Sequence, residues 1–276
     1  MAIDPIASLQ SATRVTRALF APLPADRSAE LAPELRAELL GGLEKLLAHV
    51  KPEIVHPERI PPHGAALLVG NHALMGIDSF ALLPLIVRLT GRLPRGLAEK
   101  VLLRIPLFER AALRCGAVEG THENGLALLR EGELVLVYPG GAPESFKAPE
   151  DHYKLFWQRR KGFIKLAMRA QVPIIPVMGA GVDHAYRYLF RDRWLVRHFI
   201  GQGKQRYDFP VSLGLGILPL PGKFTFHIGE PLQPPPGADS ADDPTKVDAF
   251  HALVWQSAQA QLDEAMQQWR RDHDAG

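Results

Sequence analysis

Short apolar segments patterned as strands alternate along this chain with segments patterned as helices, and this alternation constrains the fold most. The expected strands are 65–69, 95–97, 133–138, 172–177 and 224–228. The expected helices between them are 80–89, 106–115, 124–130 and 160–170. Such alternation is typical of parallel strands joined by crossover helices. The predicted fold class is therefore α/β, with a mainly parallel mixed sheet covered by helices.

Helical segments are expected at both ends. Within residues 1–50, leucines recur near a 3.6-residue period, which predicts an N-terminal helical segment with one apolar face. The leucines concerned are Leu31, Leu35, Leu39, Leu40, Leu43, Leu46 and Leu47. That face either packs on the protein's own core or anchors the chain to a membrane. Residues 51–276 then form the α/β domain, with loops expected at 51–63 and 231–245 and a closing amphipathic helix at 247–271.

Several classes of protein are excluded by composition and by missing motifs. Cys115 is the only cysteine and is interpreted as a small core residue, so no intramolecular disulfide forms and a reducing compartment is the simplest setting. No secretory signal is expected, since a basic segment followed by an apolar one is not found at the start, and the apolar stretch 80–87 is far shorter than the ~20 residues of a spanning helix. The spacings of a metal site, a serine-hydrolase elbow and a dinucleotide fingerprint are missing. A cytoplasmic protein, soluble or peripheral to the membrane, is expected, without metal or bound cofactor.

Charge is spread unevenly along the chain. Residues 154–206 contain twelve Lys or Arg and two acids, whereas residues 230–276 contain nine acids and three bases. The basic zone either attracts phosphate groups, as on a nucleotide or a lipid surface, or is solvated surface that balances the acidic tail. Within this zone, residues 186–197 mix aromatic side chains with arginines. That mixture is typical of an interfacial membrane segment and equally of a buried helix with snorkelling arginines.

The segment Gly70-Asn71-His72-Ala73-Leu74-Met75-Gly76-Ile77-Asp78 joins the first buried strand to the helix expected after it. A neutral imidazole there is able to take a proton from a hydroxyl near pH 7, and a carboxylate is able to orient it. His72 and Asp78 are six residues apart and would not meet on a regular helix, so a non-helical loop hinged at Gly76 must join them. The alternatives are that His72 caps a neighbouring carbonyl and that Asp78 caps the helix at 79–89.

A second loop, Tyr138-Pro139-Gly140-Gly141-Ala142-Pro143-Glu144, leaves the strand at 133–138. Two glycines allow close backbone approach, so the N–H groups of Gly140 and Gly141 are candidates to bind an oxyanion. Glu144 is either an orienting carboxylate or a surface acid. Lys147 and Arg160 are either contacts to an acceptor or nucleotide, or ordinary surface charges.

These motifs together resemble the glycerolipid (lysophospholipid) acyltransferase family. The longer spacing from Asn71-His72 to Asp78 and the loop Pro139-Gly140-Gly141-x-x-Glu144 look like its diacylglycerol-acyltransferase-like branch, which includes plant phytyl ester synthases. Three further stretches match that branch: Trp157-x-x-Arg160-x-Gly162-Phe163, 172–177, and 105–106 through Gly116 and Gly120 to Asn124-Gly125. The resemblance covers about residues 60–230. Pro143 stands where the main family has a phosphate-contacting Arg.

The resemblance implies an O-acyltransferase of lipid metabolism, as in phospholipid biosynthesis. It would move a fatty acyl group from acyl-CoA or acyl carrier protein to a lipid hydroxyl such as diacylglycerol, a lysophospholipid or a long-chain alcohol. His72 would be the base, Asp78 its orienting acid, and Gly140-Gly141 the oxyanion donors. The Arg missing at 143 makes a neutral acceptor plausible, although Lys147 or Arg160 would still supply a cation. A membrane surface is an expected partner and nucleic acid is not. A thioesterase on the same fold and a non-catalytic peripheral lipid-binding protein remain alternatives.

Overall fold

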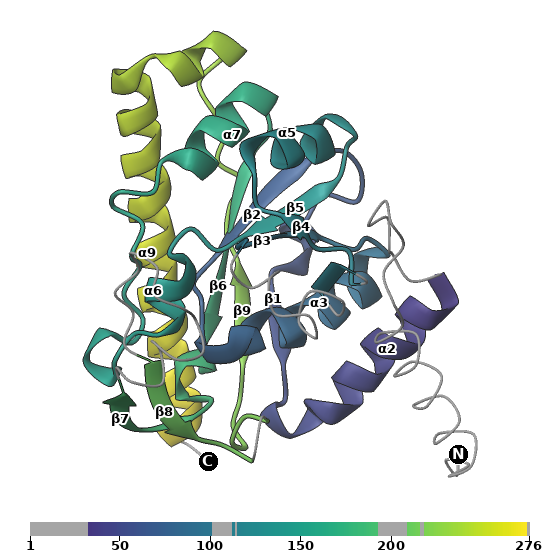
Figure 1. Ribbon diagram of the computed structural model, residues 1–276, viewed down its shortest axis with the longest axis vertical. Coiled ribbons are helices and arrows are strands. Elements are labelled where there is room, and N and C mark those ends of the chain that lie inside the picture. The colour runs from purple at the N-terminus through teal and green to yellow at the C-terminus, as the bar shows by residue number, and fades with distance from the viewer. Residues whose placement is uncertain (1–32, 101–111, 114, 193–208, 216–217, 275–276) are drawn as a thin grey trace.

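A seven-stranded sheet forms the centre of the protein in a computed structural model that describes residues 33–100, 112–113, 115–192, 209–215 and 218–274 (Figure 1). Its spatial order is β1-β9-β6-β2-β5-β3-β4. The strands are β1 Glu53–Val55, β2 Ala66–Gly70, β3 Arg95–Ala98, β4 Val118–Glu119, β5 Leu134–Val137, β6 Ile174–Ala180 and β9 Thr225–Ile228. Neighbours run parallel except β6 and β9, which pair antiparallel. The predicted mainly parallel mixed sheet is confirmed.

Helices cover both faces of this sheet, and the long helix α9 runs along one side of the molecule (yellow in Figure 1). The α-helices are α2 Pro33–Leu46, α3 Ile77–Thr90, α5 His122–Arg130, α6 Gly141–Ser145, α7 Gly162–Ala170 and α9 Pro244–Asp274. Short 3-10 helices are Ala48–Val50, Pro57–Arg59, Leu74–Gly76, Pro149–Asp151, Val182–His184 and Ala238–Asp242.

Two apolar cores lie on opposite faces of the sheet. One core joins α5, α7 and α9 to residues such as Leu67 and Val69 of β2. The other joins α3 to Ala66 and Leu68 of the same strand. Successive strand residues point to opposite faces, so a strand covered on both faces consists of apolar residues without polar alternation. This is why the central strands were recognisable as unbroken apolar runs.

Some boundaries differ from the predicted ones. Helix α3 begins at Ile77 and Gly76 occupies its N-cap position, so the prediction that Asp78 caps this helix is wrong. Strand β1 lies within the stretch predicted as loop. Strand β6 continues to Ala180, three residues beyond the predicted end. Most of the helix predicted at 106–115 falls outside the described residues.

The predicted N-terminal helical segment corresponds, within the described residues, to α2 and the 3-10 turn after it. Leu39, Leu40 and Leu47 are buried, so at these positions the leucine face packs on the protein's own core. Among the described helices, none has both the length and the apolar character needed to cross a membrane.

A separate two-stranded ribbon is formed by β7 Arg187–Asp192 and β8 Phe209–Leu213 (Figure 1). The strands pair antiparallel, with Arg187 opposite Leu213 and Tyr188 opposite Ser212. The alternative of a buried helix is therefore wrong for residues 187–192, and residues 193–197 lie outside the described residues. Aromatic and β-branched side chains favour strands.

Candidate active site

The two loops singled out in the sequence meet at the carboxyl ends of neighbouring parallel strands. Strand β2 lies between β5 and β6, so the chain leaving β2 is flanked by the segments that follow both neighbours. Asn71 bridges to β6: its Nδ2 donates to the carbonyl of Gly179 at 3.0 Å, and its Oδ1 accepts from the N–H of Gly179 at 2.8 Å. Asn71 therefore holds the end of β2 against β6, immediately before His72.

His72 and Asp78 are hydrogen-bonded, with 2.8 Å between Nδ1 and Oδ2. The 3-10 turn Leu74–Gly76 reverses the chain between them, and Gly76 takes a positive φ of 66°. Asp78 also accepts from the N–H of Ala73 at 3.3 Å. A proton on Nδ1 that is held by Asp78 leaves the lone pair on Nε2, and no described residue hydrogen-bonds that nitrogen. The ring is thus oriented to act as a base through Nε2.

Tyr138, the first residue of the second loop, was assigned no role from the sequence, and it packs directly on the imidazole. The two rings stack with centroids 4.3 Å apart, and the Tyr138 hydroxyl accepts from Ser79 Oγ at 3.0 Å. A Cβ on Gly70 would come within 2.9 Å of Tyr138 Cε1, so the glycine before Asn71 makes room for this ring. Burial, together with the charge of Asp78, raises the pKa of Tyr138 well above 10, and the phenol stays neutral.

The pKa of His72 is raised above its ordinary value of 6.5. Burial by itself lowers this pKa, because it disfavours the charged imidazolium. The charge and hydrogen bond of Asp78 outweigh burial, and the charge of Glu144 acts in the same direction. The electrostatics therefore stabilise the protonated form that a general base produces.

Glu144 is fully buried, so the surface-acid alternative is wrong. One carboxylate oxygen accepts from the N–H of His72 at 2.7 Å, and the other accepts from the N–H of Phe156 at 2.8 Å. The segment 141–145 that carries Glu144 is the short helix α6 rather than an open loop. Burial raises the pKa of Glu144, while the charge of Lys147 and the two backbone donors oppose that effect.

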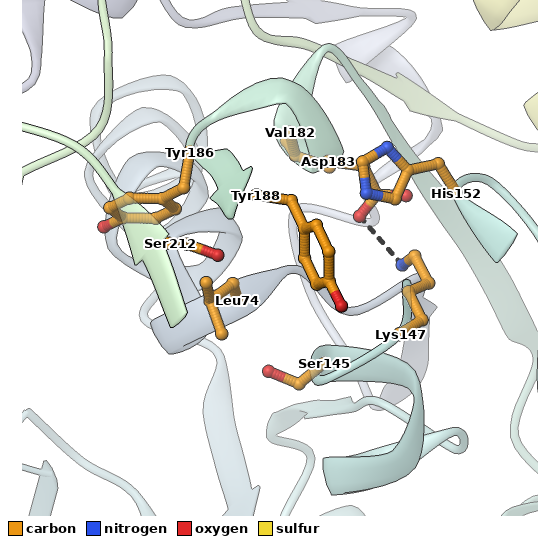
Figure 2. A pocket seen from close by; sticks show the side chains of 9 residues that line it. All are labelled: Leu74, Ser145, Lys147, His152, Val182, Asp183, Tyr186, Tyr188 and Ser212. Carbon is orange, nitrogen blue, oxygen red and sulfur yellow. Dashed lines mark ion pairs between the residues drawn. The ribbon is translucent and has the colours of Figure 1, made fainter. Parts of the chain in front are cut away.

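Lys147 is buried as well, so the surface-charge alternative is also wrong. Its Nζ lies 2.8 Å from Asp183 Oδ1, and the two side chains are only 2% and 3% exposed (Figure 2). The same Nζ donates to the carbonyl of His72 at 2.8 Å. Glu144 therefore accepts from the backbone N–H of His72, and Lys147 donates to its backbone carbonyl.

Asp183 escaped the sequence reasoning altogether. It lies in the 3-10 turn Val182–His184 just beyond β6, and its second oxygen accepts from the N–H of Tyr153 at 2.8 Å. The available signal was its position: Asp183 follows β6, a third strand whose carboxyl end lies at the same edge of the sheet. Ser145, next to Glu144, donates to the carbonyl of Ala73 at 2.9 Å and adds a further tie between the two loops.

A small cavity adjoins Lys147, with Tyr188 and Ser212 of the ribbon on its far side (Figure 2). Its volume of about 20 Å³ leaves room for roughly one water molecule. Among the described residues, the cavity that Lys147 lines is thus too small for a substrate head group, and the contacts of Lys147 are those of a residue that positions His72.

Gly140 and Gly141 are adjacent to carboxylates. A side chain at Gly140 would overlap Glu144, and one at Gly141 would overlap Glu99. The N–H of Gly141 donates to the carbonyl of Tyr138 at 3.0 Å, which leaves Gly140 as the better candidate for an oxyanion donor. Arg160 is exposed and lines a groove that also includes Gly140, so it lies beside the His72 network rather than in it.

Comparison with known proteins places this site in context. Residues 51–179 match the family model described as Acyltransferase. The chain is 31% identical over 207 residues to "DGAT1/2-independent enzyme synthesizing storage lipids" of Bos taurus, covering 73% of the chain and 58% of that protein. It is 27% identical over 209 residues to "Phytyl ester synthase 2, chloroplastic" of Arabidopsis thaliana, covering 64% and 28%. The chain thus spans less than two thirds of the length of either relative.

The fold is shared with a solved structure. The crystal structure of the 1-acyl-sn-glycerophosphate (LPA) acyltransferase PlsC from Thermotoga maritima matches with a TM-score of 0.52 and 19% sequence identity. The match covers 93% of this chain and 92% of that one, so it extends over almost the whole α/β architecture.

Proposed function

The chain belongs to the acyltransferase family, and from this premise we propose that it transfers a fatty acyl group from an acyl thioester to a lipid hydroxyl. The observation that carries the proposal is the His72–Asp78 pair: Nδ1 bonds to Oδ2, and Nε2, at the carboxyl edge of the sheet, has no hydrogen-bond partner among the described residues. A free hydroxyl is a weak nucleophile at neutral pH, and a positioned base is what its attack requires.

In the proposed step, Nε2 of His72 takes the acceptor's hydroxyl proton as the oxygen bonds to the thioester carbonyl carbon. The carbon–sulfur bond then breaks, and the leaving thiolate receives the proton from the imidazolium. Asp78 holds the tautomer and stabilises the imidazolium, as the acid of a Ser-His-Asp triad does, but no protein nucleophile takes part. The N–H of Gly140 is the proposed donor to the tetrahedral oxyanion.

The acceptor is proposed to be a neutral or weakly polar lipid alcohol such as diacylglycerol or a long-chain alcohol, with a lysophospholipid as the charged alternative. Pro143 removes the cation expected in that loop, and the names of the two relatives refer to storage lipids and phytyl esters. Acyl-CoA or acyl carrier protein is the proposed donor. The described residues include no group of three or more His, Cys, Asp or Glu that could hold a metal ion.

A cytoplasmic enzyme that works at a membrane surface is part of this proposal, and the β7–β8 ribbon is the proposed contact. Leu189, Leu213 and Leu215 are 49%, 55% and 55% exposed, and Arg187 lies opposite Leu213. Leucines beside an arginine suit an anionic lipid surface. Leu189→Ser/Leu213→Ser should reduce co-sedimentation with anionic vesicles, whereas Leu253→Ser, an exposed leucine on α9, should not. Equal binding by all three proteins would reject the ribbon as the contact.

The decisive experiment measures free-thiol release from two donors, a long-chain acyl-CoA and a carrier protein loaded with the same acyl group. Each donor is tested with and without diacylglycerol, lysophospholipid or a fatty alcohol. The comparison variant is His72→Asn, because the Asn amide still donates to Asp78 but places no atom at Nε2. His72→Ala is less suitable, since Asp78 Oδ1 is already buried without a hydrogen-bond partner among the described residues. We expect acceptor-dependent release to fall by about 10²- to 10⁴-fold in His72→Asn.

Each other outcome is informative. Release that needs no acceptor yet depends on His72 would identify a thioesterase. Undiminished transfer by His72→Asn would reject His72 as the base. If neither donor releases a thiol, and wild type and His72→Asn bind vesicles equally, the result would favour the non-catalytic lipid-binding protein.

A further inference from the structure

An open groove lies on the surface beside Glu144 and carries two adjacent arginines. It is lined by Gly140, Pro143, Phe156, Gln158, Arg159 and Arg160. Its volume of about 380 Å³ is within the range of small-molecule sites. The groove is therefore large enough for a polar group of a substrate, which the cavity beside Lys147 is not.

Both arginines are exposed, and no ion pair joins either side chain to an acid in the described part of the chain. Three of their basic neighbours are paired with acids, as Lys154–Asp151 at 2.9 Å, Lys161–Asp248 at 2.5 Å and Arg169–Asp242 at 2.9 Å. Two of these acids, Asp248 and Asp242, belong to the acidic tail, as expected where the basic zone balances that tail. Arg159 and Arg160 have no such acidic partner among the described residues, so both guanidinium groups are available to a ligand.

Helix α7 begins at Gly162, two residues after Arg160. The preceding Lys161 provides no side-chain cap, and the first turn contains no acid. The first N–H groups of a helix lack intrahelical partners and carry the positive end of its dipole. Guanidinium groups beside such a terminus form a setting suited to a phosphate, which accepts several charge-assisted hydrogen bonds at once.

The groove is also joined to the base. Phe156, in its wall, donates its N–H to one oxygen of Glu144, and the other oxygen accepts from the N–H of His72. Gly140, on the same wall, packs against the Glu144 carboxylate. A single buried carboxylate therefore separates the backbone of the groove from the backbone of His72.

We propose that the Arg159–Arg160 groove binds a phosphate group carried by one of the two substrates of the His72 site. The inference rests on the proposed acyl transfer, in which two substrates are able to bring a phosphate. One is the thioester donor, through its phosphopantetheine arm, and the other is a lipid acceptor with a phosphorylated head group. In this proposal, Arg159 and Arg160 supply the cationic contact to phosphate from outside the Pro139–Glu144 loop. Pro143, within that loop, supplies no such contact.

The test is calorimetric binding, which requires no turnover. Wild type, Arg159→Gln/Arg160→Gln and the control Lys154→Gln are each titrated with coenzyme A, pantetheine, glycerol 3-phosphate and glycerol. We expect the double variant to lose at least about tenfold in affinity for a phosphate-bearing compound, since hydrogen bonds to charged groups are lost. Its affinity for the phosphate-free counterpart should not change, and Lys154→Gln should behave as wild type.

The two sources of phosphate separate in this design. A loss confined to coenzyme A assigns the groove to the donor, and one confined to glycerol 3-phosphate assigns it to the acceptor. The proposal is overturned if wild type binds neither compound, if the double variant binds them as wild type does, or if Lys154→Gln weakens them equally. A protein that shows the Arg-dependent binding but no thiol release would retain the groove and lose the proposed reaction.

Discussion

Two cationic regions flank Glu144, and they use positive charge in opposite ways. Lys147 is buried, and its ammonium group is bonded to Asp183 and to the carbonyl of His72. Arg159 and Arg160 are exposed and have no acidic partner among the described residues. A buried ammonium must be paired, so its bonds are committed to the geometry of the protein. An exposed guanidinium has five donors that remain available to a ligand. Burial, rather than charge, distinguishes the cation that is bonded to His72 from the cations that would bind a substrate.

The strongest test of this contrast is Lys147→Met. It leaves Asp183 buried without its cation, which should lower the free energy of unfolding by about 3–5 kcal/mol. Urea denaturation measures the change. Lys147→Met/Asp183→Leu removes both charges and should recover most of the stability. If Lys147 positions His72, the double variant should not regain kcat, because the His72 carbonyl still lacks its donor.

A loss below about 1 kcal/mol in the single variant would mean that the pair is far better solvated than its 2% and 3% exposure indicates. Full recovery of kcat in the double variant would make the pair structural only.

Glu144→Gln should have an intermediate effect. The amide places an NH₂ group against the N–H of His72 or of Phe156, at a cost of about 1–3 kcal/mol for the lost hydrogen bond. A pH profile of kcat/KM gives a second measurement. His72 acts as a base only when neutral, so in wild type activity should fall as the pH drops through a pKa raised above 6.5. Burial and Asp78 dominate that pKa, but losing the Glu144 charge lowers it, and the acid limb should move to lower pH.

An acid limb that moves to higher pH in Glu144→Gln would contradict this assignment of sign. Asp183→Asn provides a comparison, since it perturbs Lys147 without removing the carboxylate that contacts His72.

The smallest expected effect completes the contrast. Arg159→Gln/Arg160→Gln should change the free energy of unfolding by less than about 0.5 kcal/mol, because exposed side chains without partners contribute little to stability. Urea denaturation in low and high salt checks this. Salt should weaken phosphate binding by wild type, since the arginines are solvent-exposed, and should leave the buried Lys147–Asp183 pair almost unaffected. A large loss of stability would show that the arginines are structural.

The sheet and the His72–Asp78 pair were accessible from the sequence because their signals are local. Strands β2, β5 and β6 are buried on both faces, and such strands appear as unbroken apolar runs. The contact between His72 and Asp78 was predicted because a regular helix cannot bring residues six apart together, whereas a turn at Gly76 can. Both predictions needed only a few consecutive residues.

The Lys147–Asp183 pair was not accessible in that way. Lys147 follows β5 and Asp183 follows β6, and the two strands lie on opposite sides of β2, so their pairing depends on the strand order of the whole sheet. The residue types Lys and Glu carry no signal of burial, which is why a surface position remained an alternative for both Lys147 and Glu144. The ribbon was missed for a similar reason, since β7 pairs with a strand whose position in sequence its own pattern does not specify.

The carboxylate of Glu144 has one further consequence, because His72 and Phe156 share it. A proton on His72 and an anion beside Phe156 act on the same group from opposite sides, so the two binding events are thermodynamically coupled. Coupling of this kind is reciprocal: the factor by which an occupied groove changes the proton affinity of His72 is the factor by which protonation changes the anion affinity. If the groove binds an anion as proposed, the charge state of His72 is therefore measurable from that ligand's equilibrium affinity, without any turnover.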